Sequence, residues 1–220
     1  MVVWCKAPHN HPNGLRRLWE ETVQRYGLWI GLGLLLGLLG VGAVALSRPY
    51  EIRGSRIDPP VPAADFSLND AEGQPFRLSE QRGKITLIFF GYTTCPDVCP
   101  ATLSEMKQVR QRLGADADRV SFVFVTVDPE RDTPERMGQY VTTFDPAIRG
   151  LTGSEAELEP VWKTFGVYRA KQEVNSAVGY LVDHTSRVYL VDQQGNLAVT
   201  YAFGTPIDDL VLDLRHLLKT

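Results

Sequence analysis

A continuous apolar run that leads into two closely spaced cysteines constrains the fold of this chain most strongly. The run extends from Lys84 to Tyr92, and the sequence Cys95-Pro96-Asp97-Val98-Cys99-Pro100 follows after two threonines. An apolar run of this length predicts a strand that is buried on both faces of a sheet. From about residue 99 or 100 to residue 113 the apolar residues return at helical spacing, and Gly114 ends the pattern. The sequence therefore predicts a strand that carries two thiols to the start of a helix.

Strands and helices alternate along the rest of the C-terminal part. The predicted elements, in chain order, are a small hairpin over 66–78, a buried strand over 120–127, a helix from residue 134, a short strand near 151, a helix over 155–165, strands over 187–192 and 196–201, and a closing helix over 207–218. Thr133 and Ser154 are expected to cap two of the helices, and residues 166–183, which show no clean period, are expected to form an inserted loop. This order predicts an α/β, thioredoxin-like fold with a central mixed sheet and helices on both faces.

One segment near the N-terminus is long and apolar enough to cross a membrane. Leu28 to Leu46 contains no charged residue, and at about 1.5 Å per residue its helix spans about 28 Å, close to the hydrocarbon core of a bilayer. Tyr26 and Trp29 lie at one edge, where aromatic rings favour the interface. A buried core helix is rarely apolar all round, and a signal peptide has a shorter apolar run, although Ala43-Val44-Ala45 is a weak cleavage candidate. We therefore expect an N-terminal transmembrane helix.

The chain is expected to have four parts. These are a short N-terminal cytoplasmic segment over 1–27, the transmembrane helix over 28–46, a Pro-rich linker over 47–60 and a globular domain over 61–220. Four basic residues precede the span and three arginines follow it closely, so the positive-inside bias slightly favours a cytoplasmic N-terminus. We expect the inner membrane of a bacterium, with the domain in the oxidising periplasm. The mitochondrial inner membrane is the alternative, although Glu20 and Glu21 are unlike a transit peptide.

Charge and cysteine content limit the classes of function. The formal net charge is -3 and no block of like charge is present, which gives nucleic-acid binding little support. The chain has only 3 cysteines, too few for a scaffold stapled by disulfides. Cys5 is isolated, whereas Cys95 and Cys99 are close together at the predicted helix start, where thiolate is favoured. The pair is expected to be reactive or metal-binding rather than two buried apolar thiols.

His184 is the candidate third ligand beside the two thiols. His9 and His11 precede the membrane segment and His216 lies in the closing helix, so His184 is the attractive partner, even though a lone histidine is more often structural. Two thiolates and one imidazole suit Cu(I), whereas Zn²⁺ usually takes a fourth ligand.

Two carboxylates stand close to these candidate ligands in the sequence. Asp97 and Asp183 are equally expected to tune the site and to be solvated loop carboxylates.

Three motifs then occur in order. They are Gly91 to Pro100 with the two cysteines, Val127 to Pro134 with the sequence VDPERDTP, and Val182 to Thr185 followed by Tyr189-Leu190-Val191-Asp192. Together they resemble the motifs of the Sco/SenC family of copper-binding proteins, which assemble cytochrome c oxidase. The resemblance covers roughly residues 61 to 220, and the N-terminal anchor also fits it.

The resemblance implies that Cys95, Cys99 and His184 bind one copper ion, as Cu(I) and in some members as Cu(II). It further implies a membrane-anchored copper chaperone that acts with cytochrome c oxidase subunit II and with other copper chaperones to assemble the dinuclear copper centre. A role in reducing the cysteines of subunit II is also implied.

The acidic and basic residues of the second motif receive a less specific role. Asp128, Arg131 and Asp132 would belong to a structural or partner-facing loop, and a solvated charged turn is their expected physical role.

A thiol-disulfide oxidoreductase is the alternative function. In that case Cys95 and Cys99 are catalytic: one thiolate attacks a disulfide of an outer-side protein and the other thiol resolves the mixed disulfide. His184 separates the two functions, because a reductase does not need it and a copper site does. A thiol peroxidase is less favoured, since it needs an arginine close to the thiolate and none lies within the cysteine motif.

Overall fold

The computed structural model describes residues 13–46, 49–174 and 179–219, and the chain divides after Tyr50 into two compact units. Cys5, His9 and His11, together with residues 47 and 48 of the expected linker, lie outside the described residues.

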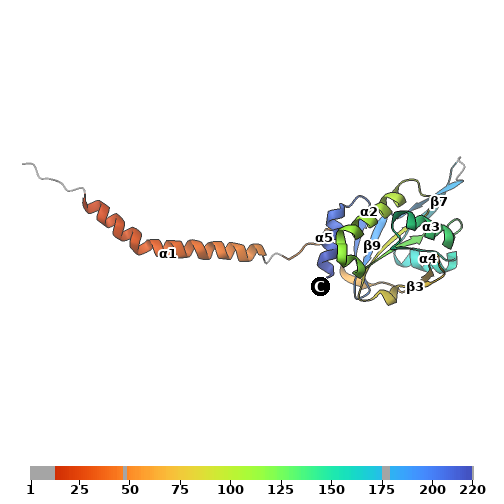
Figure 1. The fold of residues 1–220 in the computed structure, drawn as a ribbon, viewed down its shortest axis with the longest axis horizontal. Coiled ribbons are helices and arrows are strands. Elements are labelled where there is room, and N and C mark those ends of the chain that lie inside the picture. Colours follow the sequence, from red (N-terminus) through yellow and green to blue (C-terminus); the bar gives the residue numbers. More distant parts are fainter. Residues whose placement is uncertain (1–12, 47–48, 175–178, 220) are drawn as a thin grey trace, which may run out of the picture. The chain divides into compact units, whose positions relative to one another are not determined.

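The N-terminal unit contains one long helix, α1 (Asn13–Leu46) (Figure 1). The stretch from Arg25 to Gly42 is apolar and long enough to cross a membrane, and none of it is buried. The core helix of a soluble protein is mostly buried, unlike this stretch, while a signal sequence near the N-terminus can have the same length and composition as an anchor. The helix begins earlier than the predicted residue 28 because residues 13–27 contain good helix formers and no proline.

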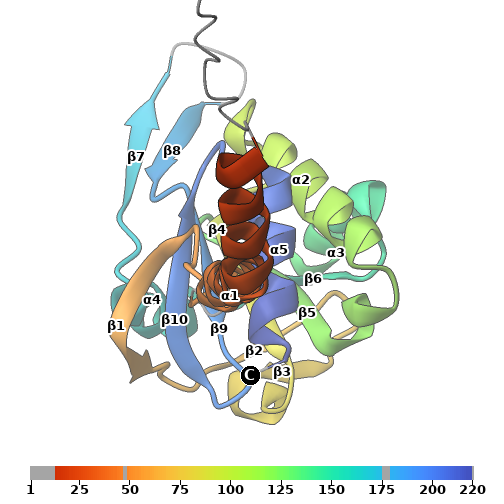
Figure 2. The same ribbon diagram turned by 90° about the vertical axis from the view of Figure 1, so that its left-hand side faces the viewer.

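The C-terminal unit is built on a six-stranded sheet in the order β1-β10-β9-β4-β5-β6 (Figure 2). Strands β4, β5 and β6 are parallel, whereas β9, β10 and β1 join the sheet antiparallel. The bounds are β1 Ser55–Pro62, β4 Ile85–Gly91, β5 Val120–Thr126, β6 Ile148–Leu151, β9 Arg187–Val191 and β10 Asn196–Ala202. The predicted mixed sheet is confirmed, and every residue of its central strand β4 is buried.

Side chains of alternate residues in β4 pack towards the helices on the two faces of the sheet. The helices are α2 Val98–Leu113, α3 Pro134–Phe144, α4 Glu155–Thr164 and α5 Ile207–Leu217. On one face the ring of Phe89 stacks on Phe124, which in turn contacts Tyr140 of α3. Figure 2 shows α2 and α5 side by side, and the two helices are in contact. On the other face Phe90 packs against Phe165, which directly follows α4.

The predicted helix caps and the small hairpin are also present. Thr133 accepts a hydrogen bond from Arg136 N at the start of α3, and Ser154 forms a capping box with Glu157 at the start of α4. The hairpin consists of β2 (Ser67–Asn69) and β3 (Pro75–Arg77). These features depend on residues that are close together in the sequence, which explains why the sequence pattern predicts them.

Two segments differ from the sequence prediction. Residues 166–183, expected to form a loop, contain most of a two-stranded sheet of β7 (Arg169–Glu173) and β8 (Tyr180–His184). Its strand β7 is polar and mostly exposed, so it carries no apolar alternation. Residues 55–60, expected to be a linker, belong to β1, which pairs with β10. The prolines of β1 are tolerated because the strand lies at an edge of the sheet.

Candidate metal centre

The side chains of Cys95, Cys99 and His184 lie together, with one potential ligand atom from each within 4.8 Å of the others. The Sγ atom of Cys99 lies 3.5 Å from Nε2 of His184, although 85 positions separate them in the sequence. The structure thus brings together all three residues that the sequence analysis selected.

The loop after β4 and the first turn of α2 position the two sulfurs. Cys95 N donates to the Tyr92 carbonyl at 3.3 Å, and Cys99 N donates to Cys95 Sγ at 3.5 Å. A Cβ atom on Gly91 would lie only 2.7 Å from Cys99 Sγ and 2.7 Å from Phe124, so glycine is required where α2 approaches the strand. Cys99 is fully buried, whereas Cys95 is partly exposed.

The two thiols differ in acidity because one donates to the other. The hydrogen bond from the Cys99 thiol, followed by one from His184 and by those from the N–H groups of Asp97 and Cys99, lowers the pKa of Cys95 to about 4, although burial acts in the opposite direction. The same hydrogen bond, which holds the proton on Cys99, and the burial of that residue raise the pKa of Cys99. The metal-free site therefore holds one thiolate at neutral pH, on the more exposed sulfur.

The ring of His184 is held by aromatic neighbours and by a backbone carbonyl. Its centroid lies 5.8 Å from that of Tyr92 and 6.2 Å from that of Phe89, both edge-on. The Nδ1 atom lies 3.2 Å from the carbonyl oxygen of Thr185. Because a carbonyl can only accept, Nδ1 is the ring nitrogen that can donate to Thr185, and Nε2 is the one that faces the Cys99 sulfur. Asp183, considered as a partner of the ring, is exposed, as is Asp97.

The two aspartates of the second motif are buried, which corrects the expectation of a solvated charged turn for them. The side chains of Asp128 and Asp132 are 0% exposed. Asp132 accepts hydrogen bonds from Thr93 N, from the Thr93 hydroxyl at 2.6 Å and from the Thr126 hydroxyl at 2.7 Å. The loop that carries Cys95 is therefore attached to the buried end of β5. Sequence spacing could not show this, because 39 positions separate Thr93 from Asp132.

Arg136 is a further residue near the site that the sequence analysis did not select. It donates to the Thr93 hydroxyl at 2.7 Å and to the Thr94 hydroxyl at 3.0 Å, directly before Cys95. Arg136 lies at the start of α3, outside the cysteine motif, so the sequence of that motif does not reveal it.

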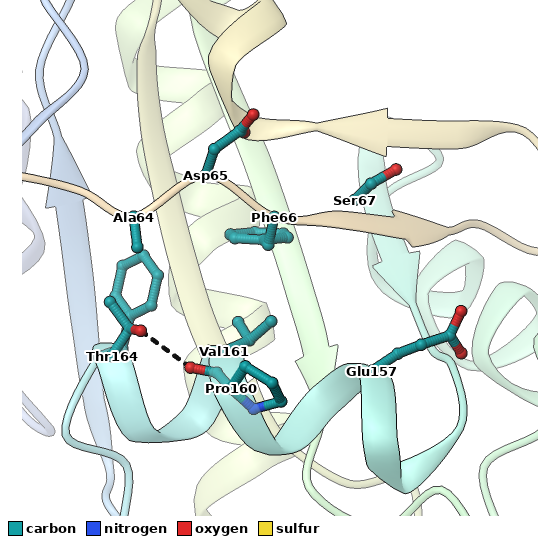
Figure 3. A pocket seen from close by; sticks show the side chains of 9 residues that line it. Ala64, Asp65, Phe66, Ser67, Glu157, Pro160, Val161 and Thr164 are labelled. Atoms are coloured by element: carbon teal, nitrogen blue, oxygen red, sulfur yellow. Dashed lines mark hydrogen bonds between the residues drawn. The ribbon is translucent and has the colours of Figure 1, made fainter.

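A separate hollow of about 310 Å³ lies between residues 64–67 and α4 (Figure 3). The labelled side chains around it include Phe66, Val161 and Glu157, and Thr164 donates to the Pro160 carbonyl at 2.9 Å within α4. Cys95, Cys99 and His184 do not line it. The hollow is therefore not part of the metal centre.

The donor set fits copper better than the other common ions. Thiolates are soft ligands that select Cu(I), and imidazole also suits copper, whereas structural Zn²⁺ takes four protein ligands. Among the residues that the structure describes, this cluster is the group of His, Cys, Asp and Glu side chains close enough to hold a metal ion, and it offers three ligands.

Comparison with known proteins points to the same chemistry. Residues 56–219 match the SCO1/SenC family model. The chain is 36% identical over 171 residues to a SCO2-like protein of Rickettsia prowazekii, covering 76% of this chain and 82% of that protein. It is similar to the structure of Bradyrhizobium japonicum ScoI with copper bound, at 39% identity and a TM-score of 0.67, covering 72% of this chain and 100% of that one.

A more distant solved structure is that of BsSco, a member of the Sco family of cytochrome c oxidase assembly proteins with a disulfide switch. It is 26% identical with a TM-score of 0.59, and the match covers 73% of this chain and 95% of that one.

Proposed function

This chain belongs to the SCO1/SenC family, and on that premise we propose that it binds one copper ion through Cys95, Cys99 and His184 as a copper chaperone for cytochrome c oxidase. The observation that carries the proposal is the convergence of two thiols and one imidazole, from two distant segments, within 4.8 Å. His184 is partly buried, and its Nε2 lies 3.5 Å from the Cys99 sulfur. The proposed recipients and donors of copper are subunit II of the oxidase and other copper chaperones.

The unequal exposure of the ligands suits transfer by ligand exchange. Cys95 is partly exposed and can be reached by a thiol of the partner, whereas Cys99 is fully buried. A partner thiolate would replace Cys95 first, and the ion stays bound to Cys99 and His184 meanwhile. Copper is then never released into water as a free ion.

The test is the copper stoichiometry and affinity of the full chain in detergent under reducing conditions. We expect one Cu(I) per chain for the wild type, loss of the site in Cys95→Ser and Cys99→Ser, and an affinity at least about tenfold lower in His184→Ala. His216→Ala is the matched control, because that histidine lies in α5 outside the cluster. Undiminished affinity in His184→Ala would contradict the three-ligand site.

Thiol-disulfide exchange is the second candidate, and the lowered pKa of Cys95 beside a buried Cys99 favours it. The Cys95 thiolate attacks a substrate disulfide and expels one substrate thiolate, and Cys99 then attacks the mixed disulfide and expels the other. The substrate gains two electrons and this chain is oxidised to a disulfide, which an external dithiol must reduce. Weak copper binding in the wild type, together with fast reduction of a protein disulfide that His184→Ala leaves unchanged, would favour this function.

The location of the copper domain is also a proposal. We place the N-terminal segment in the cytoplasm, α1 across the inner membrane and the domain in the periplasm, with the mitochondrial inner membrane as the alternative. The support is the apolar stretch Arg25–Gly42. In the oxidising periplasm the two thiols would need a reductant to stay reduced.

A further inference from the structure

We infer that Asp128, Arg131 and Tyr180, together called the hairpin clamp, are positioning residues that hold His184 at the two sulfurs. The inference rests on the proposed copper site and assigns a role to the second motif, which that proposal leaves without one. The clamp connects the loop after β5 to the strand β8, which ends at His184.

The strand that carries His184 is not anchored by the main sheet. Strand β8 pairs with β7 alone, in a two-stranded sheet separate from the six-stranded one. An isolated two-stranded hairpin is at best marginally stable in water. Strand β7 is polar and adds little apolar burial. At its C-terminal end β8 is joined to β9 of the main sheet through Thr185 and Ser186, whose backbones bond to Tyr168 and Phe203. At its other end the strand depends on side-chain contacts between the hairpin and the body of the domain.

Alternate residues of β8 make these contacts. Tyr180, Val182 and His184 are two positions apart, so their side chains share one face of the strand. Val182 is buried, and its N–H donates to the Tyr92 hydroxyl at 3.2 Å. His184 meets the sulfurs at one end of this row, and Tyr180 lies at the other end. Contacts that hold Tyr180 in place therefore also restrict the position of the strand that carries His184.

Arg131 holds Tyr180 by its backbone and by its ring. The Nη1 atom of Arg131 donates to the Tyr180 carbonyl at 2.9 Å, and the guanidinium carbon lies 3.7 Å from the centre of the tyrosine ring. Asp128 completes the clamp, since its carboxylate accepts from Arg131 Nε and, at 2.8 Å, from the Tyr180 hydroxyl. The Asp128 side chain is 0% exposed and that of Arg131 is 18% exposed, so water screens these contacts little.

The clamp and the cysteine loop are both attached to the paired strands β4 and β5. Asp128 and Arg131 follow β5, which pairs in parallel with β4 over its whole length, and β4 leads directly to the cysteine loop. The cysteines keep their own supports, the Tyr92 carbonyl and the contacts of Asp132 with Thr93, when the clamp is broken. Loss of the clamp should therefore displace the imidazole and leave the dithiol in place.

The test uses the double variant Asp128→Asn/Arg131→Met in the full chain, because removing both charges leaves neither buried and unpaired. Tyr180→Leu is the second variant and leaves the Asp128–Arg131 pair intact. The matched control is Asp70→Asn/Arg149→Met, which removes a similar aspartate–arginine pair packed on an aromatic ring, Phe76, away from the site.

The first readout is Cu(I) affinity measured by competition with a chelator. We expect both clamp variants to bind Cu(I) at least about threefold more weakly than the wild type, and the control to match the wild type. In a His184→Ala background the same clamp changes should alter Cu(I) affinity less than about twofold. Equal losses with and without His184 would overturn the inference, because they would show a general structural effect. Wild-type affinity in both clamp variants would overturn it as well.

The second readout needs no copper and so separates this inference from the proposed function. Diethylpyrocarbonate modifies accessible imidazoles, and mass spectrometry compares His184 with His216 in the metal-free chain. We expect modification of His184 to be at least about threefold faster in the clamp variants, with His216 unchanged. An unchanged rate at His184 would contradict the clamp even if copper binds as proposed. If the wild type binds no copper but the clamp variants still show faster modification of His184, the copper site alone would be rejected.

Discussion

At the scale of single residues, the two thiols of the site have different environments. Cys99 is fully buried and donates to Cys95, which is partly exposed and also accepts from the N–H groups at the start of α2. This arrangement lowers the pKa of Cys95 to about 4 and raises that of Cys99. Cys95 is therefore the nucleophile of the metal-free site, and Cys99 is the thiol that must lose its proton when a metal binds.

Alkylation of the metal-free, reduced chain measures this difference. We expect Cys95 to react with iodoacetamide at a nearly constant rate at neutral pH and to lose reactivity as the pH falls through about 4, because only the thiolate reacts. In Cys99→Ala the largest contribution that lowers the pKa is gone, so the midpoint moves to higher pH. Peptide mass spectrometry at a series of pH values gives both midpoints. An unmoved midpoint in Cys99→Ala would contradict the thiol-to-thiolate hydrogen bond.

At the scale of elements, a buried carboxylate attaches the start of the domain to the last helix. Asp213 of α5 is 0% exposed and accepts hydrogen bonds from Arg53 N at 3.0 Å, from Gly54 N at 3.0 Å and from the Tyr201 hydroxyl at 3.2 Å. A Cβ on Gly54 would come within 2.4 Å of Val199, so only glycine fits so close to β10. The domain consequently begins near residue 51 rather than at residue 61.

Replacement of Asp213 tests this attachment. In Asp213→Ala the two N–H groups and the tyrosine hydroxyl lose a buried acceptor, so we expect the free energy of unfolding to fall by about 2–3 kcal/mol. Hydrogen exchange at the amides of Arg53 and Gly54 should become faster. Asp209→Ala is the control on the same helix: it removes a partly exposed ion pair with Arg53 and should cost about 0.5 kcal/mol or less. Slow exchange retained at both amides in Asp213→Ala would contradict the attachment.

At the scale of the whole molecule, the chain combines an apolar helix with a domain that carries the metal centre. None of the stretch Arg25–Gly42 is buried, and an exposed apolar surface of this size indicates a partner or a lipid environment. The proposed function needs the domain on the side where subunit II presents its copper site.

Protease treatment of intact spheroplasts from an expressing bacterium tests this topology. We expect added protease to digest residues 51–220 before the membrane is opened, and the domain to stay in the membrane fraction when no protease is added. A cleaved signal sequence would instead release the domain in soluble form. Protection of the domain until detergent is added would contradict the proposed orientation.

The sequence by itself determined the elements whose signals are local. The apolar run of β4, the caps Thr133 and Ser154 and the helical spacing of α2 each depend on residues within a few positions of one another, so the periodicity of side chains reveals them. The position of Cys95 and Cys99 at a strand–helix junction could be predicted from the sequence for the same reason. The order of the motifs suggested that His184 joins the two cysteines, but it could not give the distances between their side chains.

Only the tertiary structure decided what depends on contacts between distant segments. It placed His184 3.5 Å from Cys99, buried the carboxylates of Asp128 and Asp132, and paired the polar strand β7 with β8. In the sequence these residues resemble a solvated turn and a loop, because polar side chains show no apolar period. The roles of the buried aspartates follow from hydrogen bonds across 39 to 160 positions, such as those of Asp132 with Thr93 and of Asp213 with Arg53. Such partners are determined by the packing of the whole domain.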